Sequence, residues 1–235
     1  NMDILIPGQQ AEQLHEQLRA VKTQLRLAMN GAASQSMREK GLSYKINFGV
    51  ELPRLKQIAA SFPKEHHLAQ ALWKEEIREC KILATMLQPV ESFLPEIADI
   101  WVERIQTQEM AEIASMNLFQ HLPYAPQKSL QWIASEEPLT QACGLLTAAR
   151  LLQKRGDLTE RVENELLDQG VTAFLSGPYV VRSAASALLR RYMQHSDEHA
   201  FTLCRRVESM KNSPNEAEQL LYQLVASEVD PFFSK

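Results

Sequence analysis

The chain has 235 residues, of which 45% are hydrophobic and 23% charged, as is usual for a globular protein. Its 8 glycines are few, which disfavours a turn-rich all-β fold, and it contains neither of the glycine-rich phosphate-binding motifs GxGxxG and GxxxxGK[ST]. The net charge of −4 excludes a domain that is basic overall, so any nucleic-acid binding must depend on a local patch.

The first 62 residues differ in pattern from the rest of the chain. Five apolar residues recur at helical spacing: Leu14, Leu18, Val21, Leu25 and Met29. We expect this helix to end at Asn30-Gly31, which has the composition of a C-cap. A short helix near 34–40 and the linker Gly41–Pro53 follow. Only Tyr44–Val50 in this linker resembles a strand, and it is short.

From residue 91 the apolar residues predict helices in pairs, which begin about 31 to 39 residues apart. The predicted pairs are 91–105 with 107–121, 127–135 with 138–154, 158–174 with 178–194, and 197–211 with 215–229. One pair cannot bury its apolar face alone, so successive pairs are expected to stack. The predicted fold is therefore all-α, a right-handed α-solenoid of stacked antiparallel HEAT-like helix pairs. An antiparallel bundle is the alternative.

Helix boundaries have the residues that usually mark them. The expected starts are Pro53, Pro138, Pro178, Asp157 with Glu160, and Ser213-Pro214-Asn215-Glu216, and the expected ends are Gly156 and Gly177. In the last of these starts, Ser213 is predicted to be the N-cap. We predict one helical-repeat domain over 1–235, with N-terminal helices and a linker in 1–62 and HEAT-like pairs in 63–235.

Three cysteines, Cys80, Cys143 and Cys204, lie far apart within apolar helical patterns. An odd, scattered set predicts reduced thiols in a cytoplasmic protein. Met2–Pro7 has no basic region followed by a long apolar core, so we expect no signal peptide. No apolar run reaches the roughly 18 residues of a membrane span, and we expect no membrane partner.

Charge is unevenly distributed along the chain. Lys and Arg outnumber Asp and Glu by nine to five in 1–64 and by ten to eight in 140–211. In 65–139 they number five against twelve, and in 212–235 one against four. The acidic segment 65–139 would suit a basic protein partner, whereas the basic segment 140–211 would suit phosphates.

Three stretches occur in an order and spacing found in one known family. Phe48–Ala59 contains Gly-aliphatic-x-x-Pro-x-Leu-Lys at a helix entry. Leu72-Trp73 is followed by Glu79-Cys80-Lys81 and Ala84, and Val181-Arg182-Ser183-Ala184 runs on to Leu189-Arg190-Arg191-Tyr192. Over residues 40–210 this resembles the DNA alkylation repair family, the HEAT-like alkylpurine DNA glycosylases related to AlkD.

The resemblance implies excision of positively charged alkylated bases. Such a site needs a carboxylate near the sugar, aromatic rings against the cationic base and basic groups on the phosphates. The family's Trp-x-x-x-Asp aligns with Gln108 to Glu112, which makes Glu112 the candidate catalytic residue. A second family tryptophan aligns with Ala187, the following Leu-Arg pair keeps Arg190, and a further family arginine aligns with Gln141. The alternative for Glu112 is a solvated helix residue.

Basic residues of the C-terminal half are the candidate nucleic-acid-binding residues. The predicted set is Arg182, Arg190, Arg191, Lys154 and Arg155, to which Arg205 and Arg206 can be added. The alternative is mixed surface charge paired with neighbouring acids. The three tryptophans, Trp73, Trp101 and Trp132, are expected to pack in the core and not to stack on bases. His66-His67 has no third ligand at metal spacing, and neither a metal nor another cofactor is predicted.

The predicted function is that of an AlkD-like DNA-repair-family protein. It is expected to bind double-stranded or damaged DNA on a concave face, with weak or absent alkylpurine DNA glycosylase activity. The alternative is a non-catalytic helical-repeat scaffold for protein–protein interaction, because solenoids present long surfaces suited to that role.

Overall fold

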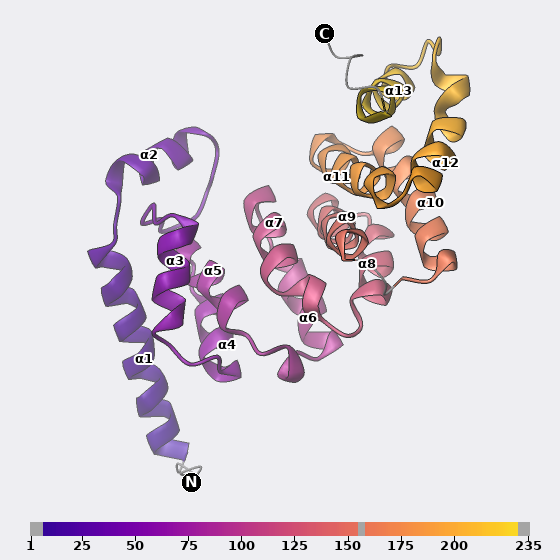
Figure 1. Cartoon of the computed structure of the whole chain (residues 1–235). Coiled ribbons are helices and arrows are strands. Elements are labelled where there is room, and N and C mark those ends of the chain that lie inside the picture. The colour runs from indigo at the N-terminus through magenta and orange to yellow at the C-terminus, as the bar shows by residue number, and fades with distance from the viewer. Residues whose placement is uncertain (1–6, 155–157, 230–235) are drawn as a thin grey trace. The chain divides into compact units, whose positions relative to one another are not determined.

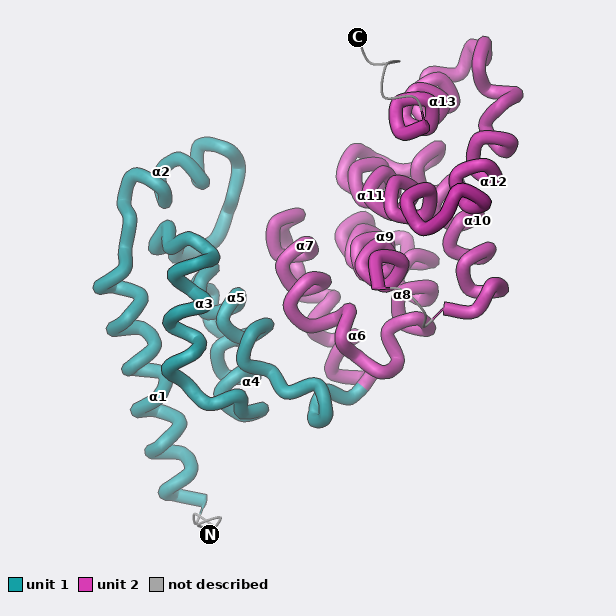
Figure 2. Tube along the Cα trace, viewed as in Figure 1, with its two compact units in different colours: residues 1–94 teal, residues 95–235 magenta. Residues whose placement is uncertain are grey.

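A computed structural model describes residues 7–154 and 158–229, and within them the chain forms 13 α-helices and no β-strand (Figure 1). The expected all-α fold is confirmed. The chain divides into two compact units, Asn1–Leu94 and Pro95–Lys235, called unit 1 and unit 2 below (Figure 2). A single repeat domain over the whole chain stays a prediction. No described helix has both the length and the apolar character that crossing a bilayer requires.

Unit 1 is built around the contact between two short helices, α4 and α5, against which α1 and α3 pack. Its elements are α1 (Pro7–Leu27), α2 (Gly31–Glu39), α3 (Leu52–Ala60), α4 (His66–Lys74), α5 (Arg78–Leu87) and the 3-10 helix η1 (Val90–Ser92). Only Val21 and Leu25 of α1 are buried. Most of this long helix therefore contributes no side chain to the core.

The expected C-cap at Asn30-Gly31 is wrong. Helix α1 ends at Leu27, and Asn30 is instead the N-cap of α2. Its side-chain oxygen accepts a hydrogen bond from the backbone N–H of Ala33 at 3.0 Å, and its backbone is extended rather than left-handed. Asparagine suits both ends of a helix, so its presence between two helices did not decide which one it caps.

A buried ion pair fixes the linker between α2 and α3. The guanidinium of Arg78 lies 2.6 Å from Oε2 of Glu79, and the two side chains are 3% and 0% exposed. Glu79 Oε1 accepts from the Phe48 backbone N–H at 2.8 Å, and Arg78 donates to the Val50 carbonyl at 3.0 Å. The strand-like stretch Tyr44–Val50 forms a single parallel bridge, between Ile46 and Ile77.

Unit 2 consists of two layers of helices. One layer contains α6 (Pro95–Glu103), α8 (Ala125–Ile133), α10 (Glu160–Ser176) and α12 (Asp197–Val207). The other contains α7 (Gln108–Asn117), α9 (Pro138–Gln153), α11 (Tyr179–His195) and α13 (Glu216–Val229), and each of these helices contacts the next (Figure 1). The 3-10 helices η2 (Phe119–His121) and η3 (Glu208–Met210) lie in the connections. These are the four helix pairs predicted from the sequence.

Most predicted helix boundaries in unit 2 are confirmed, and one cap is corrected. Pro138 lies in the first turn of α9, and Gly177 is the C-cap of α10. Asn215, not Ser213, caps α13, since its side-chain oxygen accepts from the Glu218 N–H at 3.0 Å. Ser213 donates instead to the carboxylate of Glu218 at 2.5 Å. Gly156 and Asp157 lie outside the described residues.

The tryptophans and cysteines belong to the packed interior. Trp73, Trp101 and Trp132 are all buried, as predicted, and Trp132 donates to Asp99 at 3.0 Å, which ties α8 to α6. All three cysteines are free thiols, and Cys80 and Cys143 are buried. Burial raises the pKa of the Cys80 thiol to about 12, which makes it a poor nucleophile near neutral pH.

Helices α8 and α9 touch backbone to backbone at Gly144. A Cβ atom on Gly144 would lie 2.6 Å from the Ile133 nitrogen and 2.7 Å from the Ser129 oxygen. Backbone atoms cannot move aside as the tip of a flexible side chain can.

We expect Gly144→Ala to lower the free energy of unfolding by about 1–3 kcal/mol, measured by urea denaturation. Gly31→Ala is the control, because no atom lies within 4 Å of that position. Equal stability of the two variants would contradict this close packing.

The Arg78–Glu79 pair leads to a second stability prediction. Glu79→Ala leaves the Arg78 charge buried and the Phe48 N–H without its acceptor, so we expect a loss of about 3–5 kcal/mol in the free energy of unfolding. Glu76 is a matched control, because it is 70% exposed and lies 3.8 Å from Lys45. Glu76→Ala should change stability by no more than about 0.5 kcal/mol. A small effect of Glu79→Ala would show that the linker is held by other contacts.

Candidate nucleic-acid interface

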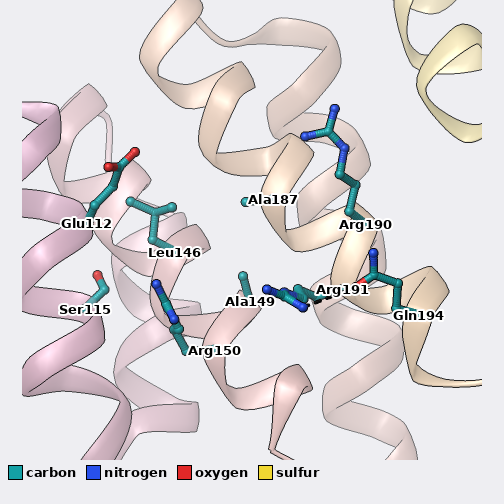
Figure 3. Close-up of a pocket in the computed structure, with 9 residues that line it drawn as sticks. All are labelled: Glu112, Ser115, Leu146, Ala149, Arg150, Ala187, Arg190, Arg191 and Gln194. Carbon is teal, nitrogen blue, oxygen red and sulfur yellow. Dashed lines mark hydrogen bonds between the residues drawn. The ribbon is translucent and has the colours of Figure 1, made fainter. Parts of the chain in front are cut away.

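Three successive helices of one layer of unit 2 enclose a pocket of about 370 Å³. We call it the arginine pocket. Its lining comes from α7, α9 and α11 and comprises Glu112, Ser115, Leu146, Ala149, Arg150, Ala187, Arg190, Arg191 and Gln194 (Figure 3). Its volume is within the range of ordinary small-ligand pockets.

The hollow exists because small side chains occupy the places where the three helices meet. Ser115, Ala149 and Ala187 each fill little of the space between α7, α9 and α11 (Figure 3). Ser115 is fixed from the side of the core, where its hydroxyl accepts a hydrogen bond from the Thr147 hydroxyl at 3.3 Å. Both residues are buried, so this bond sets α7 against α9 beneath the pocket.

Three arginines and one carboxylate, that of Glu112, line this pocket. Arg190 has a half-exposed side chain and lies 3.3 Å from Glu228 of α13. Arg191 donates to the Gln194 side chain at 3.2 Å, and no ion pair joins it or Arg150 to a described carboxylate. Arg190 and Arg191 are exposed and Arg150 is partly exposed, so these weakly paired guanidinium groups keep donors available for a phosphate.

Glu112 is placed at the rim by α7, whose first turn is capped by Thr107. Its side chain is exposed. The Gln108 amide lies 3.5 Å from Glu112 and also donates to Ser183 of α11 at 3.3 Å. Because water reaches this carboxylate, its stabilisation of a developing positive charge is screened.

The fold brings together some of the residues predicted from the sequence and separates others. Glu112, Arg190 and Arg191 line the arginine pocket. Arg182 does not, because its Nε donates to the Phe174 carbonyl and its guanidinium lies 5.6 Å from that ring. Lys154 donates to the Gln120 carbonyl at 3.3 Å, away from the lining, and Arg155 lies outside the described residues.

Two further basic residues also lie elsewhere. Arg205 lies 5.6 Å from the ring of Phe201, and Arg206 pairs with Asp168. Conversely, Arg150 lines the arginine pocket but was not among the residues predicted from the sequence. It is on α9, the same helix as Gln141, with which the family's arginine was aligned, but nine positions further along. Arg150 lies four positions, about one helical turn, after Leu146, so the two share a face of α9. That spacing was the available signal in the sequence.

A family model agrees with this architecture. The model of the family described as DNA alkylation repair enzyme matches residues 21–202, more than three quarters of the chain. The chain belongs to this family. A search of curated proteins found no significant sequence match.

A solved structure has a similar fold, with a TM-score of 0.73 and 17% sequence identity. The match covers 86% of this chain and 91% of the other. That protein is described as belonging to a new family related to the HEAT-like repeat DNA glycosylases, with affinity for branched DNA structures. At this identity the match establishes the HEAT-like helical fold.

Three of the five positions aligned with the family's site converge in this chain. Glu112, Ala187 and Arg190 were assigned from separate sequence motifs on two helices, and all three line the arginine pocket. None of the nine described lining residues is aromatic. At the position aligned with the family's second tryptophan, Ala187 therefore contributes open space in place of a stacking ring.

Proposed function

We propose that this member of the DNA alkylation repair family binds DNA through the arginine pocket, with weak or absent excision of alkylated purines. The observation that carries the proposal is the convergence of Arg150, Arg190 and Arg191 on one hollow from two helices. Arginine binds phosphate oxygens in bidentate fashion, and a cluster of this kind gives a protein with net negative charge a local site for DNA.

Branched DNA is the favoured ligand. The structurally similar protein has affinity for branched DNA structures, and the hollow in this chain is lined by cations and small residues, not by rings that stack on a base. A junction brings phosphates of different strands close together. Three guanidinium groups around one hollow fit such a cluster of charges better than they fit the evenly spaced backbone of a regular duplex.

Base excision requires more than this pocket provides. Departure of a base leaves positive charge on the sugar, which a carboxylate stabilises best in a desolvated site. The Glu112 side chain is exposed, and the aromatic contacts that would hold a cationic base are missing from the described lining. Weak turnover is therefore proposed for this chain.

DNA binding can be tested by fluorescence anisotropy with a labelled four-way junction and a duplex of equal length, over a salt series. We expect tighter binding of the junction. Arg190→Ala/Arg191→Ala should weaken binding, and the dependence of log K on log salt should become shallower by about 1 for each phosphate that the variant no longer neutralises.

The control is Arg205→Ala/Arg206→Ala, which removes an equal charge from two adjacent arginines on α12. Equal weakening by both double variants would mean that the arginine pocket is not the binding site. If the parent protein fails to bind either DNA at low salt, the proposal is wrong and the protein-scaffold alternative takes its place. Capture of a protein partner from nuclease-treated lysate would then be the next measurement.

Excision can be measured separately as release of 7-methylguanine from alkylated duplex. We expect the parent protein to release the base at a rate within about tenfold of spontaneous loss, with Glu112→Gln unchanged, because the carboxylate is screened by water. Faster release that Glu112→Gln abolishes would contradict this expectation and would identify the chain as an active glycosylase.

A further inference from the structure

Two histidines and one glutamate meet where three helices of unit 2 come together. Glu163 is on α10, His195 is the last residue of α11, and His199 is in the first turn of α12. One potential ligand atom from each lies within 4.8 Å of the others. These side chains are 13%, 21% and 18% exposed respectively, so the group is mostly desolvated but open to small ions.

Hydrogen bonding determines how His195 presents its ring. Its Nδ1 lies 3.2 Å from the Leu152 carbonyl, which can only accept, so Nδ1 carries a proton. In the neutral ring Nε2 then has a lone pair, and it faces Oε1 of Glu163 at 3.6 Å. A lone pair and a carboxylate oxygen directed at the same space attract a cation. A histidine ligand of a metal is typically held in this way, with its other nitrogen donating to a carbonyl.

His199 completes the group. Its Nε2 lies 2.6 Å from Oε2 of Glu163, and its Nδ1 lies 2.5 Å from the Ser196 hydroxyl. That hydroxyl can donate or accept, so the ring can present either a proton or a lone pair at Nε2. The ring packs edge-on against Tyr192, with centroids 4.7 Å apart, and its position is therefore restricted.

We propose that Glu163, His195 and His199 bind one divalent transition-metal ion of the Zn²⁺ type, with water as the fourth ligand. Two imidazole nitrogens and one carboxylate oxygen are a donor set suited to Zn²⁺, whose bonds to these atoms are about 2.0–2.1 Å long. Tetrahedral ligands at that radius lie about 3.3 Å apart. In this structure Oε2 of Glu163 lies 2.6 Å from Nε2 of His199, and Oε1 lies 3.6 Å from Nε2 of His195, so the carboxylate faces both rings at distances near that spacing.

The donor set also disfavours ions that prefer oxygen ligands. Mg²⁺ and Ca²⁺ prefer six or more oxygen ligands, and this group offers a single carboxylate.

The ion would connect α10, α11 and α12 directly. It would also fix the end of α11 one residue beyond Gln194, which lines the arginine pocket. The sequence signal is the His195-x-x-x-His199 spacing, but the third proposed ligand lies 32 residues before His195 and so is not part of that local pattern.

The test uses the full chain without a histidine tag, stripped of metal and titrated with Zn²⁺ in competition with a chromophoric chelator. We expect one equivalent to bind. His199→Gln and Glu163→Gln should each weaken affinity at least tenfold. Glu163→Gln keeps a hydrogen-bond acceptor for His199, and its melting temperature without metal verifies that it folds. Co²⁺ in place of Zn²⁺ should give the intense visible bands of four-coordinate geometry.

Two variants serve as controls for other ligands. His66→Gln/His67→Gln removes the adjacent pair in unit 1, and Cys204→Ser removes the partly exposed thiol; neither should change the affinity. The proposal is overturned if the parent binds no Zn²⁺, if Glu163→Gln and His199→Gln bind as tightly as the parent, or if a control variant abolishes binding. The first result would leave a proton-bridged His–Glu–His group with a purely structural role.

Discussion

The distance between α8 and α9 is set at Gly144, and the arrangement of unit 2 depends on it. Because Gly144 has no Cβ, the α9 backbone lies so close to Ser129 and Ile133 of α8 that a Cβ would come within 2.7 Å of their backbone atoms. Helix α9 is thereby central: it contacts α7 and α11 in its own layer as well as α8 in the other. The hydrogen bond between Thr147 and Ser115 then fixes α7. The arginine pocket is the outer side of these same contacts.

Because the pocket lies on the outer side of these helix contacts, it can be hollow without weakening the fold. The pocket-facing residues of α11 recur at helical spacing on one face, and the core-facing residues lie on the opposite face. Leu188 is 0% exposed and packs inside, whereas its neighbour Ala187 lines the pocket. Burial of large apolar side chains supplies most of the stabilisation, and those side chains lie on the inner faces. The chemistry of the lining can therefore differ between proteins that share this architecture.

The sequence predicted the helix pairs well, because apolar spacing and proline or glycine boundaries are local properties of the chain. Local signals failed at Asn30 and Asn215, where capping depends on which backbone N–H groups lie within reach of the side chain. The lining of the candidate site was predicted in part. Family motifs identified Glu112 and Arg190, but the contribution of Arg150 and the separation of Arg182 from the pocket depend on how α9, α10 and α11 pack. The Glu163–His195–His199 group depends in the same way on three helices meeting.

The two candidate sites of unit 2 differ in how far water reaches their charges. The arginine pocket is open to water, so its charges would act on the proposed DNA ligand through several weak, salt-sensitive contacts. The Glu163–His195–His199 group is mostly shielded from water, where one small cation interacts strongly with a single carboxylate. Binding at the first should therefore respond steeply to ionic strength, whereas binding at the second should respond to competing chelators. The end of α11 links them, since Gln194 and His195 are consecutive residues that belong to different sites. An ion that holds His195 would restrict the turn of α11 carrying Arg191 and Gln194, and so reduce the entropy lost when those side chains bind a phosphate.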